Sequence, residues 1–512
     1  MTNSYENVRV RFAPSPTGPL HVGGVRTALY NYLFARHFGG TMILRIEDTD
    51  QNRYVPGAED YIIDSLTWTG IRFDEGVHVG GPFAPYRQSD RKEIYRKYAD
   101  ELVGKGHAYY AFDTAEELDL RRKDAEKEKQ VFTYDASVRK QMKNSLVLSA
   151  DETSRRLESG EHYVIRYMIP ESETLVFNDI IRGEMTVHTN TLDDKVLYKS
   201  DGMPTYHLAN IVDDHLMEIS HVIRGEEWLP SLPLHILLYR SFGWQAPLFA
   251  HLPLILKPEG SGKLSKRDGD RLGFPVFPTE WKDPFTGEIS SGYRESGYFP
   301  ETVVNMLALL GWNPGTEQEV FSMDELIREF TLERVGKSGS RFDPAKAKWF
   351  NHHYLVAKGT EELTSLFQQK LRQRNINKPD AYVGRVVELV KDRSDFVSQF
   401  WEQSYFFFEA PSSYDMEIVR KKWKDDTPAL LWAFKESLQH LSDFKAESIK
   451  THAESFVQSN GTGLGQLMSP LRLCLVGGSF GPDLSLICEM LGKSEVGSRI
   501  ERALEYISKQ TS

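Results

Sequence analysis

Residues 8–12, Val-Arg-Val-Arg-Phe, form a short alternating segment whose β-branched residues are typical of a strand. Residues 13–19, Ala-Pro-Ser-Pro-Thr-Gly-Pro, cannot continue a strand or a helix because prolines and a glycine interrupt them. Apolar residues recur at helical spacing from His21 onward, and residues 42–46 predict a second strand. This order of strand, tight loop, helix and strand opens a doubly wound, Rossmann-type fold, so it predicts an α/β class for the first part of the chain.

The length of 512 residues exceeds what one hydrophobic core supports, so we expect several domains. We assign residues 1–107 to the first half of the Rossmann domain. Residues 108–205, with a highly charged helix and strand-like pieces, are expected to form an α+β insertion. Residues 206–344 resume the nucleotide-binding pattern and include a basic, glycine-rich loop. Residues 345–512 repeat apolar side chains at i, i+3, i+4 and i+7, which predicts an all-helical region.

Charge does not decide whether the chain binds nucleic acid. The chain carries 73 acidic and 62 basic residues, a net charge of −11, but binding depends on local basic patches rather than on the total. Basic clusters occur at residues 121–129, 139–143, 337–348 and 420–424. Each cluster can equally be a solvated helix face.

The cysteine content and the hydropathy indicate a compartment. Only Cys474 and Cys488 occur, so no disulfide framework is expected and a reducing environment is favoured. No apolar run approaches the roughly 18 residues of a membrane span, and the N-terminus lacks the apolar core of a secretory signal. We therefore expect a cytoplasmic protein that contacts no membrane.

The stretch His21-Val-Gly-Gly24 lies at the expected start of the first helix. A helix N-terminus offers free N–H groups, and glycines let a phosphate approach the backbone. His21 can donate a hydrogen bond to phosphoryl oxygens as charge develops on them. Taken alone, His21 fits the role of a helix-capping residue better than the role of a phosphate ligand.

The stretch Gly262-Lys-Leu-Ser-Lys-Arg267 places three cations and a serine in a glycine-flanked loop. Such a loop suits the negative charge that grows on the phosphates as pyrophosphate leaves. The loop is not a Walker motif, because the G-x-x-x-x-G-K-[ST] spacing is missing. Taken alone, it can equally be a solvated turn.

Together, a histidine turn early in a nucleotide fold and a later K-L-S-K loop form the bipartite signature of class I aminoacyl-tRNA synthetases. The chain resembles the bacterial glutamyl-tRNA synthetases of this class in six stretches: residues 11–23 (RFAPSPTGPLHVG), 45–50 (RIEDTD), 206–210 (YHLAN), 212–215 (VDDH), 222–228 (VIRGEEW) and 263–266 (KLSK). The resemblance implies ATP-dependent attachment of L-glutamate to tRNA(Glu) through a glutamyl-adenylate, with Mg²⁺ shielding the phosphates. No protein nucleophile is needed for these steps, so positioning and charge stabilisation carry the catalysis.

The resemblance also implies domain roles. It assigns residues 108–205 to the acceptor end of tRNA, and it assigns the lysine loop and a stem-contact region to residues 206–344. It assigns residues 345–512 to the anticodon, and by a loose match Arg393 would inspect the third anticodon base. Further cations and aromatic residues lie near Arg393 in the sequence: Lys391, Arg420, Lys421, Lys422, Phe400, Trp401 and Trp423.

Site residues follow from the same resemblance, and the chemistry of the side chains supports them. Glutamate has two carboxylates and one ammonium, so its pocket needs arginine forks and an anionic counterpart. The expected glutamate site comprises Arg11, Ala13, Ser15, Glu47, Tyr206, Asn210 and Arg224. The expected ATP site comprises His21, Gly23, Glu227, Leu254, Lys263, Ser265 and Lys266. Of these, His21, Lys263 and Lys266 are expected to be catalytic. Without the resemblance, Arg11 and Glu47 would be interpreted as a structural ion pair.

The chain departs from many relatives in its insertion. Those relatives hold zinc through cysteines just after the position of Tyr109, whereas residues 107–112 (HAYYAF) contain none. One or two histidines cannot supply four zinc ligands, so we expect no structural zinc and no other protein-bound metal. Residues 275–299, rich in aromatic residues and glycine, form an extra segment whose function the sequence does not indicate.

Several alternatives remain. Glutaminyl specificity is disfavoured because relatives of that kind usually carry a β-barrel C-terminal region. A small nucleotidylyltransferase or a truncated tRNA-modifying paralogue would be shorter, and a non-enzymatic relative would lose His21, Lys263 or Lys266. Whether tRNA(Gln) is also glutamylated stays open, as does a requirement for tRNA in glutamate activation. We expect a monomer.

Overall fold

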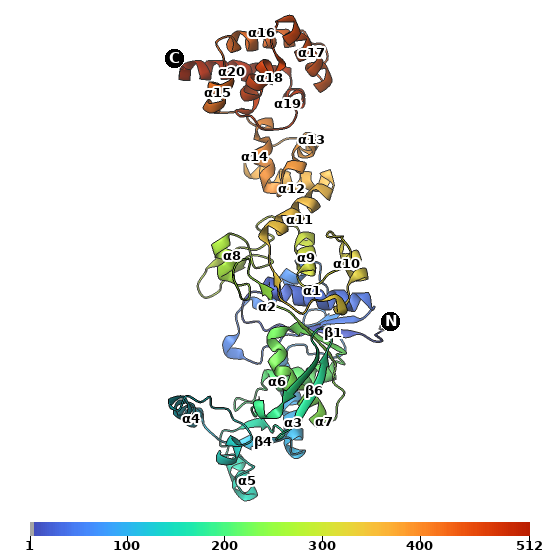
Figure 1. Ribbon diagram of the computed structural model, residues 1–512, viewed down its shortest axis with the longest axis vertical. Coiled ribbons are helices and arrows are strands. Elements are labelled where there is room, and N and C mark those ends of the chain that lie inside the picture. The colour runs from blue at the N-terminus through green and yellow to red at the C-terminus, as the bar shows by residue number, and fades with distance from the viewer. Residues whose placement is uncertain (1–4, 512) are drawn as a thin grey trace. The chain divides into compact units, whose positions relative to one another are not determined.

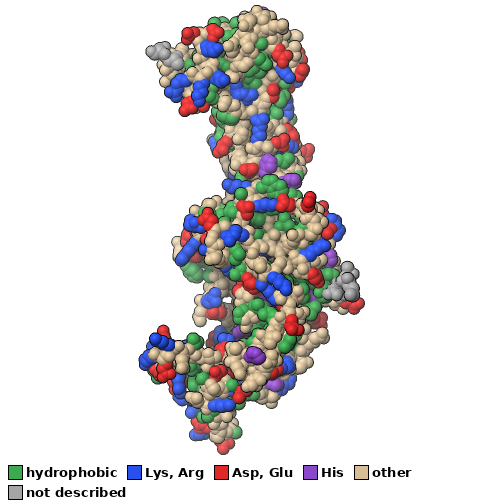
Figure 2. Space-filling view, viewed as in Figure 1, with side chains coloured by type: hydrophobic (Ala, Val, Ile, Leu, Met, Phe, Trp, Pro, Cys, Tyr) green, Lys and Arg blue, Asp and Glu red, His purple; other side chains and the backbone are tan. Residues whose placement is uncertain are grey.

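The computed structural model describes residues 5–511 (Figure 1). The chain forms two compact units, Met1–Ala347 and Lys348–Ser512. On the face drawn in Figure 2, Lys and Arg side chains are interspersed with Asp and Glu side chains over both units. Within residues 5–511, no helix combines the length and the apolar character that a membrane crossing requires.

The first unit contains two sheets of mainly parallel strands, as the doubly wound fold predicted from the sequence requires. One sheet has the order β1-β2-β3, and its strands are β1 (Arg9–Phe12), β2 (Thr41–Leu44) and β3 (Glu75–Gly76). A second sheet has the order β7-β6-β10-β9, and its strands are β6 (Thr174–Asp179), β7 (Gly183–His188), β9 (His221–Gly225) and β10 (Leu248–Leu252). The two sheets are linked where Ser220 N donates to Arg9 O at 2.9 Å, so β9 starts beside β1.

Helices carry the chain between these strands. The first unit contains α1 (Val22–His37), α2 (Ala58–Trp68), α3 (Lys92–Gly104), α6 (Tyr206–Leu216), α7 (Leu232–Phe242), α8 (Lys266–Leu272), α9 (Pro300–Leu309) and α10 (Met323–Glu329). The expected helix that starts at His21 is α1, and His21 is its N-cap. Val25, Leu29 and Leu33 of α1 are almost completely buried, which confirms the apolar face that the sequence predicts.

The predicted insertion is only partly separate from the nucleotide-binding sheets. An antiparallel sheet of order β4-β5-β8 contains β4 (Ala108–Ala111), β5 (Val164–Tyr167) and β8 (Val196–Tyr198). The charged helices α4 (Ala115–Lys127) and α5 (Ala150–Glu158) have no buried residue and lie at the end of the first unit away from α1 (Figure 1). The β6–β7 hairpin instead pairs with β10, where Asp179 is the register partner of Phe249.

The remaining strands of the first unit form two-stranded sheets. Residues beyond the lysine loop form β12 (Trp281–Lys282) and β13 (Ile289–Ser290), and β11 (Ile255–Leu256) pairs with β14 (Ser340–Arg341). The segment 275–299 packs on the nucleotide fold. Val22 N, the first amide of α1, donates to Val276 O at 3.0 Å, and Tyr61 Oη on α2 donates to Thr279 O at 2.6 Å.

The second unit is helical throughout the residues described after β14. Its helices are α11 (Pro344–Ala357, which begins in the first unit), α12 (Thr360–Gln373), α13 (Asp380–Val390), α14 (Phe400–Ser404), α15 (Met416–Lys422), α16 (Thr427–Gln439), α17 (Ala446–Ser459), α18 (Leu464–Val476), α19 (Leu484–Leu491) and α20 (Lys493–Thr511). Val383, Val386 and Val387 are buried, as their helical spacing predicts. Gly492, between α19 and α20, has a φ of 82°. This conformation favours glycine, and α19 ends there.

Candidate active site

One cavity of about 630 Å³ lies in the first unit at the carboxyl ends of β1, β2 and β9. This is where doubly wound folds bind ligands, and the volume fits a small molecule. The cavity brings together most of the predicted substrate residues: Arg11, Ala13, Ser15, His21, Gly23, Glu47, Tyr206, Asn210, Arg224, Glu227, Leu254 and Lys263. Ser265 and Lys266 are not among the residues that line it.

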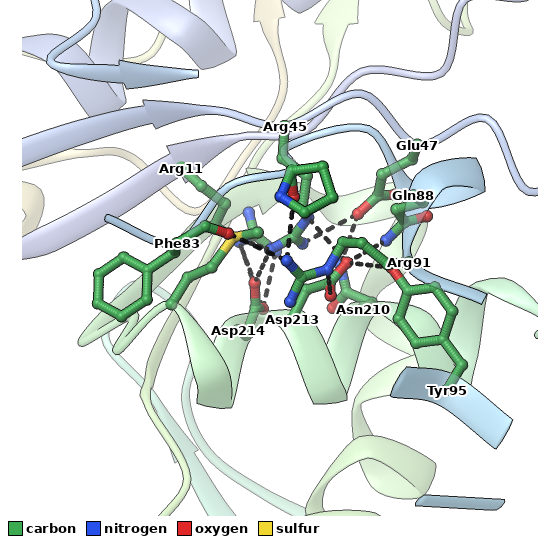
Figure 3. Close-up of polar contacts among 12 residues, drawn as sticks. Arg11, Arg45, Glu47, Phe83, Gln88, Arg91, Tyr95, Asn210, Asp213 and Asp214 are labelled. Atoms are coloured by element: carbon green, nitrogen blue, oxygen red, sulfur yellow. Dashed lines mark hydrogen bonds and ion pairs between the residues drawn. The ribbon is translucent and has the colours of Figure 1, made fainter. Parts of the chain in front are cut away.

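A buried charge cluster supports the floor of the cavity (Figure 3). Arg11 Nε donates to Asp214 Oδ1 at 3.1 Å, and Arg45 Nη1 donates to the same oxygen at 2.8 Å. Burial acts to raise the pKa of Asp214, but the two guanidinium charges outweigh it and lower that pKa overall. The structure thus pairs Arg11 with Asp214, and it shows no Arg11–Glu47 ion pair among the described residues.

Asp213, the neighbour of Asp214 on α6, anchors the other side of the cluster. Its carboxylate accepts hydrogen bonds from Gln88, Arg91 and Tyr95, each at 2.8 Å. Figure 3 shows Arg91, which directly precedes α3, and Tyr95 on α3 reaching Asp213. Asp214 therefore ties α6 to the ends of β1 and β2, and Asp213 ties it to the start of α3.

Glu47 retains one carboxylate oxygen for a ligand. Arg45 Nη2 and Asn210 Nδ2 both donate to Glu47 Oε1, each at 3.0 Å. Asn210 lies one helical turn before Asp214 on α6, so both side chains reach the same face of the cavity. Among the described residues no hydrogen bond reaches Glu47 Oε2, which leaves this oxygen to accept from an ammonium group.

Arg224 is a buried cation without a carboxylate partner among the described residues. Its Nη1 donates to Tyr206 Oη at 2.8 Å, and its Nε donates to His251 Nε2 at 3.0 Å. A longer contact of 3.4 Å joins Nη1 to Nδ1 of His235, whose pKa burial lowers well below its usual value. Because these partners are neutral, the guanidinium keeps its full charge for an anion in the cavity.

His21 lines the cavity, and one of its ring nitrogens has no partner among the described residues. Gly23 N donates to His21 Nδ1 at 3.1 Å, so Nδ1 is unprotonated and Nε2 carries the hydrogen. Nε2 is buried and has no hydrogen-bond partner among the described residues. Burial, helped by the charge of Lys263, lowers the pKa of His21 to about 4, so the ring is a neutral N–H donor near pH 7. The capping role and the ligand role are therefore compatible, since they use different nitrogens.

Glu227 and Lys263 form an ion pair at the other side of the cavity. Lys263 Nζ lies 3.0 Å from Glu227 Oε1, and both side chains are about half exposed. Burial acts to raise the pKa of Glu227, but bonds from its own backbone N–H and from Lys263 lower it overall. The pair places an exchangeable cation near His21, as a phosphate-binding loop requires.

Sequence comparison identifies the family that this geometry indicates. Residues 7–349 match the family described as tRNA synthetases class I (E and Q), catalytic domain. The chain belongs to this family. Residues 361–504 match an anticodon binding domain. The resemblance and the fold class predicted from the sequence are thereby confirmed.

Full-length relatives agree with the family match. A glutamate–tRNA ligase of Christiangramia forsetii is 58% identical over 500 residues, which cover 98% of this chain and 99% of that protein. A glutamate–tRNA ligase of Parabacteroides distasonis is 59% identical over 503 residues, which cover 98% of this chain and 99% of that protein. A crystal structure of a glutamate tRNA ligase from Elizabethkingia meningosepticum in complex with its amino acid has a TM-score of 0.96 at 53% identity, and the match covers 98% of this chain and 99% of that chain.

Two predicted site residues of the lysine loop of this synthetase, Ser265 and Lys266, do not line the cavity. Ser265 is the N-cap of α8, and its hydroxyl donates to Asp268 at 2.6 Å. Lys266 Nζ lies 2.7 Å from Glu288 Oε1 in the segment 275–299. The structure therefore brings Lys263 to the cavity and does not bring Ser265 or Lys266 there.

Hydrophobic and polar side chains, rather than cysteines, hold the β4-β5-β8 sheet together. Tyr109 Oη donates to Asp194 at 2.7 Å, and Arg139 pairs with the same carboxylate at 3.2 Å. Arg139 is buried, so its place in a basic sequence cluster does not make it available to nucleic acid. Within residues 5–511, no group of three or more His, Cys, Asp or Glu side chains could hold a metal ion. The absence of zinc stays a prediction.

The predicted anticodon residue lies in the second unit. Arg393 is exposed, and its Nη1 donates to Gly481 O at 2.7 Å. Trp401 is partly exposed, and the guanidinium of Arg374 lies 4.3 Å from its ring centroid. Phe400, one of the aromatic residues near Arg393 in the sequence, is fully buried and packs edge-on against Phe367, so it is not exposed for stacking on a base.

Some members of the buried charge cluster that supports the cavity were not assigned from the sequence. Arg45, Asp213 and Asp214 occur in motifs that resemble the family, but the patterns indicate no pairing partner for them. The density of charged residues directly after β2 and at the end of α6 is the signal that could have indicated these three residues. Charged side chains in segments expected to be buried need partners.

Proposed function

We propose that this chain catalyses the ATP-dependent attachment of L-glutamate to tRNA(Glu) through a glutamyl-adenylate. The observation that carries the proposal is the buried, uncompensated guanidinium of Arg224 in the same cavity as the free Glu47 oxygen. A cation and an anion held in one cavity fit an amino acid that has a side-chain carboxylate.

In the proposed complex, Arg224 binds the side-chain carboxylate of glutamate through N–H groups of Nη1 and Nη2, whose contacts to His235 and to Trp228 O are long at 3.4 Å. The Tyr206 hydroxyl accepts from Arg224, so its own hydrogen is free to donate to the same carboxylate. Glu47 Oε2 receives the α-ammonium, with Ala13 and Ser15 beside it. Glutamine would turn an amide NH₂ toward the N–H groups of Arg224, and this unfavourable contact disfavours it.

Activation then needs only positioning and charge stabilisation. The α-carboxylate of glutamate attacks the α-phosphorus of ATP, a bond to the bridging oxygen breaks, and pyrophosphate leaves. His21 Nε2–H and Lys263 donate to phosphoryl oxygens whose charge increases in this step. Gly23 and Leu254 line the ATP side, and Mg²⁺ enters with the phosphates as part of the substrate. The terminal ribose hydroxyl of tRNA then attacks the adenylate carbonyl and releases AMP.

The domain roles belong to the same proposal. Residues 108–205 bind the acceptor end, residues 206–344 carry the lysine loop and stem contacts, and residues 345–512 read the anticodon. We also propose a cytoplasmic, monomeric enzyme whose partners are tRNA(Glu), L-glutamate and ATP. The match of residues 361–504 to an anticodon binding domain supports the last of the domain roles.

Aminoacylation with purified tRNA isoacceptors tests the proposal. Glutamate and glutamine are each offered with tRNA(Glu) and with tRNA(Gln), and charged tRNA is counted. We expect glutamate to be attached to tRNA(Glu) and glutamine to neither tRNA. Attachment of glutamate to both tRNAs identifies a non-discriminating enzyme, whereas attachment of glutamine contradicts the proposed pocket.

A further inference from the structure

The contacts behind Arg224 form a chain of three buried side chains. Asp179 lies at the end of β6, and one of its carboxylate oxygens, Oδ2, is 2.6 Å from His251 Nδ1. The other ring nitrogen, His251 Nε2, is 3.0 Å from Nε of Arg224. Asp179 and His251 have fully buried side chains, so water does not compete for these bonds.

The chemistry of the two end groups determines where the proton of the His251 ring lies. A carboxylate only accepts hydrogen bonds, so the ring nitrogen that faces Asp179 must carry the hydrogen. A guanidinium only donates, so the nitrogen that faces Arg224 must be bare. Burial lowers the pKa of His251 despite the opposing effect of Asp179, which agrees with a neutral ring. One tautomer, with hydrogen on Nδ1, satisfies both neighbours.

The turn that carries Asp179 holds His251 at further points. Asp179 also accepts from the backbone N–H of His251 at 3.1 Å, and Arg182 Nε donates to His251 O at 3.3 Å. The backbone N–H groups of Ile181 and Arg182 donate to Asp179 Oδ1 at 3.0 and 2.9 Å. These bonds fix the carboxylate and the ring together, so neither can rotate independently.

Arg224 differs in this respect from the arginines of the buried charge cluster. Arg11 and Arg45 contact Asp214, and Arg91 contacts Asp213, so each shares its charge with a carboxylate. A histidine acceptor can orient a guanidinium as a carboxylate does, but it adds no negative charge at the contact. Asp179 itself is one residue further away, behind the ring.

We propose that Asp179 and His251 are positioning residues for the amino-acid pocket, in which Asp179 fixes the tautomer of His251 and His251 orients Arg224 without neutralising it. The inference rests on the proposed function, because Arg224 there binds the side-chain carboxylate of glutamate. It adds that recognition of this carboxylate depends on a turn of the β6–β7 hairpin, which lies outside the cavity lining.

Two substitutions of one residue separate the roles of the two ring nitrogens. In His251→Asn the amide nitrogen replaces Nδ1, so the donor to Asp179 is kept and the acceptor for Arg224 is lost. In His251→Gln the amide oxygen reaches the position of Nε2, so the acceptor for Arg224 is kept. We expect His251→Asn to raise the KM for glutamate about ten- to a hundredfold, the cost of a lost bond to a charged group. We expect His251→Gln to recover much of that loss, with the KM for ATP close to that of the unsubstituted protein in both.

Arg224→Gln, measured in the same assay, distinguishes failure of the inference from failure of the proposed function. If Arg224→Gln leaves the KM and kcat for glutamate unchanged, the proposed pocket is wrong. If Arg224→Gln impairs glutamate use but folded His251→Asn and His251→Gln behave alike, the inference about His251 is wrong and the pocket stands. Equal rises in the KM for glutamate and ATP would also overturn the inference, because they indicate a general structural role.

Asp179→Asn provides a second test if His251→Asn does not fold. Two backbone N–H groups hold Oδ1, so the amide oxygen takes that place and the amide nitrogen faces His251 Nδ1. The ring proton must then move to Nε2, where it opposes the N–H of Arg224. We expect the KM for glutamate to rise while the KM for ATP is preserved. An unchanged KM for glutamate in folded Asp179→Asn would overturn the inference.

Discussion

Lys266 Nζ donates to Glu288 Oε1 at 2.7 Å, which ties the first turn of α8 to the hairpin β12–β13. Both side chains are more than one-third exposed, so the pair contributes less than about 1 kcal/mol to stability. Such a bond is easily exchanged for a stronger one to phosphate. In this structure Lys266 is bound to Glu288, whereas Lys263 lines the cavity.

Lys266→Ala should lower the rate of adenylate formation by on the order of 10²-fold, because a cation that stabilises the leaving pyrophosphate is lost. ATP–pyrophosphate exchange, assayed with tRNA present, measures the rate. Glu288→Gln is the matched control, since it removes the same ion pair and keeps the lysine. We expect Glu288→Gln not to lower the rate. Near-normal exchange by Lys266→Ala would exclude Lys266 from catalysis.

His21 should act as a neutral donor over the whole working pH range. Its pKa is lowered to about 4, so the ring loses its proton as pH rises through about 4 and is uncharged above that value. His21→Gln keeps an N–H donor near the position of Nε2 but cannot ionise. We expect the ratio of the exchange rates of the unsubstituted protein and of His21→Gln to stay constant between about pH 5.5 and 8. A ratio that changes through about pH 6.5, the ordinary histidine pKa, would show that His21 titrates in the active enzyme.

Much of the cavity could be predicted because its residues lie in short contiguous motifs. His21 and Gly23 occur within one helix turn, and the expected cap and helix start agree with the structure. Tyr206 and Asn210 are four residues apart on α6, so helical spacing alone places them on one face. The strand–loop–helix order of the first segment predicts a doubly wound fold, and such folds bind ligands at the carboxyl ends of their strands.

The contacts that orient these residues could not be predicted, since they join segments far apart in the sequence. Asp179 and His251 meet only because β6 pairs with β10, and the sequence indicates neither this pairing nor its register. The same limit applies to the segment 275–299, which carries no motif. The place of that segment beside α1 and α2 depends on buried contacts such as Tyr61 to Thr279.

Metal analysis of the purified protein should find no stoichiometric zinc. Cys474 and Cys488 are buried, and burial raises the pKa of Cys488 to about 12, which disfavours the thiolate that zinc requires. Residues 107–112 contain a histidine but no cysteine. The measurement is elemental analysis after dialysis against a chelator, with a zinc-binding relative as the positive control. One zinc per chain that survives dialysis would contradict the prediction.

Arg393→Ala should weaken the response of the enzyme to the third anticodon base. Loop bases are best recognised by hydrogen bonds to their exposed edges. The guanidinium of Arg393 is exposed, and among the described hydrogen bonds it makes one, from Nη1 to Gly481 O. The lost discrimination should be about 1–3 kcal/mol, by analogy with a bidentate base contact, or roughly a ten- to hundredfold change in kcat/KM. Charging of tRNA(Glu) transcripts that differ only at this base measures it.

Arg385→Ala is the control for Arg393→Ala, because Arg385 is an exposed arginine of the same unit that pairs with Glu489. A general loss of positive charge would weaken tRNA binding equally in both variants and at every anticodon sequence. A specific contact would change the ratio between the two transcripts only in Arg393→Ala, with glutamate activation unaffected because the cavity lies in the first unit. If both variants discriminate between the transcripts like the unsubstituted protein, Arg393 does not inspect that base, and recognition of the anticodon must rest on other side chains of the helical unit.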